Sequence, residues 1–279
     1  MKYHSACIAA LLCAPGLAAQ QMRNYEYARP LHGERRLNAV IEFAAGRLVV
    51  RSADRGRLYG LSLNYDAERF RPVGRYDADA AEVHLGVEGT GSGGIRVNSR
   101  RALPQQALIE LPLDVDLTLD ASLGAAESTL DLGGLRLTAL EVKTGASRTT
   151  IHFETPATGS CRTASVSSGA GELTVTEAGN SGCRSWRLEG GVGEVNFDLA
   201  GAWPADARLT MNMALGGVTL SAPRDLGLRV RLSGFLSNFD AKGFSKDGKT
   251  YTSNNFASAR RHIEVEVSSA LGGVSVVWK

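Results

Sequence analysis

Two cysteines are the residues whose type and spacing best define a chemistry. Cys161 and Cys183 lie 22 positions apart, and no histidine stands between them. A metal site would need more ligands, so the pair indicates a disulfide bond rather than a metal centre. Disulfides persist in oxidising compartments outside the cytoplasm. The sequence therefore predicts a Cys161–Cys183 disulfide and gives no sign of a metal or of any other cofactor.

The acidic residues and histidines do not form a recognisable catalytic set. Asp114, Asp116 and Asp120 are the densest group of carboxylates, but alternating acids on an outer strand face are usually only solvated. The histidines beyond the first 19 residues stand apart from one another, at His32, His84, His152 and His262. Polysaccharide lyases also use β-helices and need clustered carboxylates beside a lysine or arginine, so a glycan-processing enzyme is the least favoured alternative. We predict a protein that is not an enzyme.

A polar insertion at about 240–262 is the segment where the sequence suggests a binding surface. It contains a tight hairpin turn from Lys246 to Lys249 and several aromatic and basic side chains. The candidate binding residues are Phe244, Lys246, Lys249, Tyr251, Phe256, Arg260 and Arg261. The favoured alternative is a capping hairpin whose aromatic side chains cover the end of the core. Insertions in solenoids often form the binding face, so both interpretations stay open.

A repeated motif must position these residues. A short alternating strand ends, a corner of small residues follows, and a second alternating strand begins. The second strands are predicted to open at Leu130, Ile151, Leu173, Val195, Val218, Phe239 and Val274. The gaps are 21, 22, 22, 23, 21 and 35 residues, a period typical of a stacked repeat protein. We expect an all-β, parallel β-helix-like solenoid, right-handed, with about 21–23 residues per coil.

Small residues mark the predicted corners, two positions before each second strand. Glycine takes this place at Gly46, Gly171, Gly193, Gly216 and Gly272, whereas Ser128, Thr149 and Ser237 take it in other units. Glycine suits a sharp bend because it adopts positive φ without steric cost. One period also separates the two cysteines, so they should lie on adjacent coils about 4.8 Å apart, close to disulfide geometry. Near the C terminus, Trp278 is expected to close the last rung.

The first residues resemble a secretory signal peptide. Lys2 provides the charge, residues 6–12 are apolar but too short to span a bilayer, and cleavage is expected near Ala19. No later segment resembles a transmembrane helix, so the mature chain is expected to be exported, to the periplasm or beyond. Its near-zero net charge argues against nucleic acid as a partner. We divide the chain into the signal peptide 1–19, an irregular β region 20–112 that packs on or starts the solenoid, and the solenoid 113–279.

Four segments together resemble a known family. Residues 46–50, 63–72, 119–135 and 234–244 are similar to the toast-rack domain, which is related to LiaF-like, cell-wall-active-antibiotic response proteins and to β-helical adhesins. The resemblance covers most of the chain and implies a parallel β-helix-like solenoid without known catalytic residues.

Together these observations predict an exported, non-catalytic solenoid that acts as a binding, adhesion or cell-envelope scaffold module. The partner would be an envelope protein or glycan that the sequence does not identify. The alternative, an accessory sensor of cell-envelope stress, is implied by the family resemblance alone.

Overall fold

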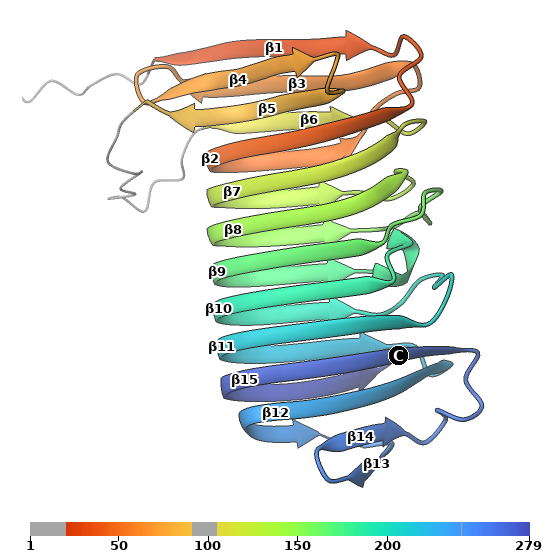
Figure 1. Cartoon of the computed structure of the whole chain (residues 1–279). Helices are drawn as coiled ribbons and strands as arrows, with labels where there is room; N and C mark the ends of the chain where they lie inside the picture. Colours follow the sequence, from red (N-terminus) through yellow and green to blue (C-terminus); the bar gives the residue numbers. More distant parts are fainter. Residues whose placement is uncertain (1–20, 91–104, 241) are drawn as a thin grey trace, which may run out of the picture.

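The protein is an elongated stack of bent β-strands. The computed structural model describes residues 21–90, 105–240 and 242–279, and Figure 1 shows the stack with its two ends. The strands of the described residues form one continuous sheet, and the only helix among these residues is the short 3-10 helix η1, Ala178–Ser181. The all-β solenoid expected from the period is therefore confirmed, whereas the predicted signal peptide lies outside the described residues.

Eight long parallel strands form the body of the stack, and each strand is one coil. In spatial order they are β2 (Arg36–Ser52), β7 (Asp116–Asp131), β8 (Leu137–His152), β9 (Thr163–Thr176), β10 (Ser185–Asp198), β11 (Ala207–Ala222), β15 (Arg261–Trp278) and β12 (Leu226–Asp240). Each ribbon crosses one face of the stack, bends, and returns along the other face (Figure 1). The two halves of every strand therefore enclose a core between them.

Side-chain alternation places the apolar residues in that core. Along β7, for example, Leu117, Leu119 and Ala121 are fully buried, whereas the residues between them are partly exposed. Within the core, the indole of Trp186 makes edge-to-face contacts with Phe153 and Phe197, at ring-centroid distances of 5.9 and 5.2 Å. Stacking thus joins the apolar faces of separate coils into one continuous core, which a single coil could not form.

The bend of each coil is built by glycines in register. Gly171, Gly193, Gly216 and Gly272 stack on one another with φ between +128° and +155°. A Cβ atom on Gly193 would also overlap the carbonyl oxygen of Gly171 in the preceding coil. Glycine is therefore required at these bends for both its positive φ and its lack of a side chain.

In the first coils the bend lies two residues earlier than we predicted. The residues in register with Gly171 are Ser147 and Ala126, not Thr149 and Ser128. The corresponding second halves therefore open at Ser128 and Thr149 rather than at Leu130 and Ile151. The error arose because Ser128 and Thr149 point into the core, with 2% and 1% exposure, where the alternation pattern favoured an apolar residue.

The last strand of the stack does not follow chain order. β15 lies between β11 and β12 and is parallel to both, with Val265 paired to Leu209 on one side and Val230 on the other. The terminal coil is therefore β12. Trp278 thus lies on the penultimate rung. The expectation that it closes the last rung is wrong, because β12 lies outside β15.

Antiparallel strands cover both ends of the stack. At one end β5 (Glu82–Gly89) and β6 (Gln106–Leu111) pair in parallel with the two halves of β2 and form the base of this cover. They are followed outward by the antiparallel strands β4 (Phe70–Asp77), β3 (Arg57–Asp66) and β1 (Met22–Pro30). At the other end the hairpin of β13 (Phe244–Asp247) and β14 (Thr250–Ser253) pairs with β12.

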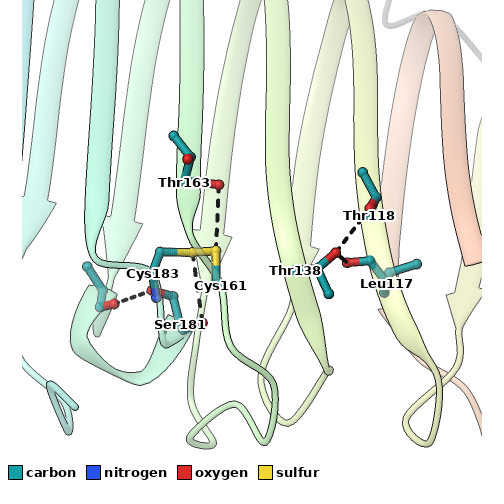
Figure 2. The surroundings of a disulfide bond; sticks show 8 residues. Leu117, Thr118, Thr138, Cys161, Thr163, Ser181 and Cys183 are labelled. Atoms are coloured by element: carbon teal, nitrogen blue, oxygen red, sulfur yellow. Dashed lines mark hydrogen bonds between the residues drawn. A yellow bond between two sulfur atoms is a disulfide. The ribbon is translucent and has the colours of Figure 1, made fainter. Parts of the chain in front are cut away.

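The predicted disulfide joins two neighbouring coils. Cys161 and Cys183 each lie two residues before a pair of matched residues, Thr163 and Ser185, so they occupy equivalent positions. Their Cα atoms are 4.2 Å apart and their sulfur atoms are bonded, as Figure 2 shows. The amide of Cys183 also donates to the hydroxyl of Ser181 at 3.1 Å. The bond therefore links successive coils at the edge where the connecting loops enter the strands.

Candidate binding site at the capped end

The predicted binding loop forms the cap on the terminal coil. The hairpin turn expected at Lys246–Lys249 is present, because Asp247 pairs with Thr250 across Gly248. β14 then pairs with the first half of β12, antiparallel, from Arg229 to Arg231. In Figure 1 this hairpin closes the lower end of the stack.

Two of the predicted aromatic residues cover the end of the core. The Phe244 ring contacts Phe239 and Trp278 at centroid distances of 5.8 and 5.5 Å. The Tyr251 ring lies 4.4 Å from that of Phe239. Phe244 and Tyr251 therefore act in part as a cap, and their faces toward the core are occupied by neighbouring rings.

The other predicted residues are spread over the outside of the cap. The Phe256 ring lies under the Arg229 guanidinium, 4.3 Å from its centroid, and Lys246 lies over Tyr251. Arg261 donates to the carbonyl of Trp203 at 3.1 Å and so ties the insertion to an earlier loop. Lys249 and Arg260 are both exposed on the surface, and neither contacts one of the aromatic rings.

A cavity of about 530 Å³ opens between this cap and the end of β15. It is lined by Arg224, Lys242, Gly243, Asn254, Asn255, Val276 and Trp278. None of the described residues that line it is acidic, and two are cationic. The cavity therefore combines an aromatic ring, two amide side chains and positive charge.

Hydrogen bonds hold the walls of this cavity in place. The Asn255 side-chain amide donates to the carbonyls of Arg224 and Leu226 at 2.9 and 2.8 Å. The Trp278 indole donates to the carbonyl of Lys242 at 3.2 Å. No carboxylate in the described part of the chain pairs with the exposed guanidinium of Arg224. This group is consequently available to an anion from solution.

The residues of this cavity are not connected by any pattern in the sequence. Arg224, Asn254 and Trp278 come from three separate segments, and only their arrangement in space shows that they belong together. Asn254 and Asn255 lie within the predicted insertion but were passed over in favour of its aromatic and basic residues. Trp278 was noted only as a packing residue. A pair of asparagines beside an aromatic-rich turn was the one signal that could have indicated them.

The acidic cluster noted in the sequence forms ion pairs. Asp116 accepts from the guanidinium of Arg136 at 2.7 Å, and Asp114 accepts from Arg55 at 3.2 Å. Each carboxylate has its own arginine, so the two do not face a common site. In the described residues no three metal-ligating side chains come together, and no helix is long and apolar enough to cross a membrane.

The remaining histidines hydrogen-bond locally. His84 contacts Glu82 at 2.8 Å and His152 contacts the hydroxyl of Thr176 at 2.9 Å. His262 lies beside Asp206, and the hydrogen bond from the His262 amide is the main cause that lowers the pKa of Asp206. These contacts hold strands and loops together and are not arranged around a cavity.

The architecture defines a class: an all-β solenoid with one bent strand per coil, antiparallel caps and a polar cavity at one end. The chain belongs to the toast-rack family. A family model described as the N-terminal domain of toast_rack, DUF2154, matches residues 18–176. A comparison with curated proteins gave no match.

The chain is also similar to solved structures. A candidate cell adhesion protein from Clostridium sporogenes aligns with a TM-score of 0.50 and 16% identity, covering 93% of this chain and 100% of that chain. A candidate adhesin from Bacteroides fragilis aligns with a TM-score of 0.45 and 11% identity, covering 93% and 98%. At these identities the likeness concerns the fold alone.

Proposed function

We propose that this protein is an exported, non-catalytic binding module of the adhesion type, which contacts an acidic glycan of the cell envelope through the cavity at its capped end. The observation that carries the proposal is the composition of that cavity. It places the Trp278 ring near the Arg224 guanidinium and Asn254, with no carboxylate among its described lining residues.

This set of side chains matches the chemistry of a sugar that bears a carboxylate. The C–H face of a pyranose packs against an aromatic ring, its hydroxyls bond to amides, and its carboxylate pairs with a guanidinium, which binds such groups in a bidentate manner. The cavity of about 530 Å³ lies in the range of small-ligand sites. A binding role without catalysis is supported by Asp114 and Asp116. These two carboxylates lie away from the cavity, and each forms an ion pair with its own arginine.

Export is supported by the disulfide. Cys161 and Cys183 are bonded across two coils, and structural disulfides are rare in reducing compartments. The expected result is a mature protein that begins near Gln20 and is recovered outside the cytoplasm. N-terminal sequencing of the chain after cell fractionation tests this, and an intact chain that remains in the cytoplasm would contradict it.

Fluorescence provides a direct test of the cap cavity. Trp186 and Trp203 are 1% and 7% exposed, whereas Trp278 is partly exposed at the cavity, so a ligand there should change the emission of Trp278. Titration with oligogalacturonates should give a saturable change that is lost in Trp278→Phe. Affinity measured by calorimetry should fall about tenfold in Arg224→Ala, the loss expected for a charge-assisted pair.

The matched control is Lys249→Ala, which removes a cation from the hairpin outside the cavity lining. This variant should bind as tightly as the wild type. Equal loss in Lys249→Ala and Arg224→Ala would mean that general positive charge, and not the cavity, is responsible. No binding of any acidic oligosaccharide by the wild type would refute the proposed ligand class.

A further inference from the structure

A second groove runs along the bent edge of the stack, away from the cap. It has a volume of about 610 Å³ and crosses five neighbouring coils, β8, β9, β10, β11 and β15. One bank is a row of polar side chains in register: Lys143, Ser167, Glu189, Asn212 and Ser268. Because paired strands lie about 4.8 Å apart, this row extends for roughly 19 Å along the axis of the stack.

Close packing of the coils produces the floor of the groove. The floor consists of small residues, among them Gly169, Gly191 and Ala214. A Cβ atom on Gly191 would overlap the carbonyl oxygen of Gly169 in the preceding coil. The floor therefore has no side chain larger than a methyl group at Gly169, Gly191 and Ala214, and an open channel remains beside the polar row.

Exposed aliphatic side chains follow the floor on the same strands. Val192, Leu215 and Leu271 are in register on β10, β11 and β15, and they are 56%, 45% and 59% exposed. Among the described residues only one other large apolar side chain, Val277, is comparably exposed. Single exposed apolar residues are normal, but a contiguous row of them is typical of a contact surface.

The repeating rows fit a polymer whose units repeat along the stack and that has polar groups on one edge and apolar faces. The polar row has little net charge, since Glu189 opposes Lys143, which itself pairs with Glu141 at 2.7 Å. An extended peptide advances about 3.3 Å per residue and would not keep step with rungs about 4.8 Å apart. A pyranose unit is close to one rung in length and offers both hydroxyls and C–H faces.

We propose that this groove binds a linear, neutral polysaccharide that lies along the axis of the stack with one sugar unit on each coil. Its hydroxyls bond to the row that contains Ser167, Glu189 and Asn212, and its C–H faces pack on the row that contains Leu215. The site extends the proposed binding function to a second surface and does not depend on the cap cavity.

The test uses the full chain with cello-, chito- and xylo-oligosaccharides, from disaccharide to octasaccharide, measured by calorimetry. Affinity should rise with chain length to about five sugar units, since five rungs form the row, and then level off. Leu215→Gln should weaken binding about tenfold, and Asn212→Ala about two- to tenfold. Ala214→Phe, which fills the floor, should abolish it.

Two controls separate this site from the cap and from misfolding. Thr219→Ala lies on the other outer face of β11 and should leave the affinity unchanged, as should Trp278→Phe. Thermal unfolding of each variant shows whether it is folded. If Ala214→Phe does not fold, the affinity of Leu215→Gln alone tests the proposal. Binding that is independent of length, or unaffected by Leu215→Gln, would overturn the proposal, as would no binding of any of the three series. Self-association that Leu215→Gln abolishes, without sugar binding, would instead assign the aliphatic row to a second copy of the chain.

Discussion

Asp206 and His262 join β11 and β15, two strands that are neighbours in the sheet although they are far apart in the sequence. The His262 amide donates to one Asp206 carboxylate oxygen at 2.9 Å, and its ring Nδ1 lies 3.3 Å from the other. Asp206 immediately precedes β11 and His262 is the second residue of β15. The pair therefore fixes the register in which β15 begins beside β11.

This contact should make stability depend on acid pH. The hydrogen bond from the His262 amide, aided by the His262 ring and Arg261, holds the pKa of Asp206 below its ordinary value. A carboxyl whose pKa is lower when folded contributes stability above about pH 4, and this is lost as the pH falls through the folded pKa. The difference in unfolding free energy between wild type and Asp206→Asn should therefore be largest above pH 4 and shrink toward pH 2. Denaturation at a series of pH values measures this, with the exposed Glu266→Gln on the outer face of β15 as control.

The disulfide should be a major stabilising element. Closing a loop with a sequence separation of 22 is expected to contribute about 3 kcal/mol by restricting the unfolded chain. Cys161→Ser/Cys183→Ser should lower the free energy of unfolding by this amount, and reducing the wild type should have the same effect. Chemical denaturation with and without dithiothreitol provides the comparison. A double variant as stable as the oxidised wild type would contradict the prediction.

Adjacent glycines at one bend should respond in opposite ways to the same substitution. Gly216 has φ +140° and a Cβ there would overlap the carbonyl of Gly193, whereas a Cβ on Gly217 would meet nothing within 4 Å. Gly216→Ala should destabilise by about 1–3 kcal/mol or more. Gly217→Ala should be neutral or stabilise by up to about 1 kcal/mol. Thermal unfolding of the two variants decides this, and equal effects would mean that the bend does not constrain Gly216.

Asn180 should be important because it bridges loops from three coils. Its side-chain amide donates to the carbonyl of Phe153 at 2.8 Å, and its side-chain oxygen accepts from the amide of Ala202 at 2.8 Å. Asn180→Ala would leave both groups without partners in a buried setting, at a cost of roughly 2–4 kcal/mol. Asn196→Ala, on the outer face of β10, is the matched control and should change stability by less than about 0.5 kcal/mol. Urea denaturation of both variants measures the difference.

The regular part of the solenoid could be predicted because its physics is local. Glycine followed two residues later by an apolar residue marks the bends at Gly171, Gly193 and Gly216, and the same period places Cys161 beside Cys183. In β7 and β8, where no glycine marks the bend, the predicted position of the bend was wrong. Thr149 is buried at the start of a second half and its hydroxyl lies 3.2 Å from that of Ser147, a pairing that alternation of apolar residues does not reveal.

The order of the coils and the cap cavity could not be predicted for a different reason. The alternating apolar pattern of β15 suits any position in the stack, so its place between β11 and β12 depends on pairings far apart in sequence. The cavity likewise brings Arg224 close to Trp278 only because β15 enters beside β12. Both features depend on tertiary arrangement and not on local spacing.

The position of β15 also constrains how the molecule can be assembled. A ribosome makes β12 before β15, so the terminal coil exists before its inner neighbour does. The stack therefore cannot grow by adding coils in the order of synthesis. Either β12 stays apart from β11 until β15 has docked, or β11 and β12 pair first and must separate to admit β15; in both cases the last two coils assemble out of chain order.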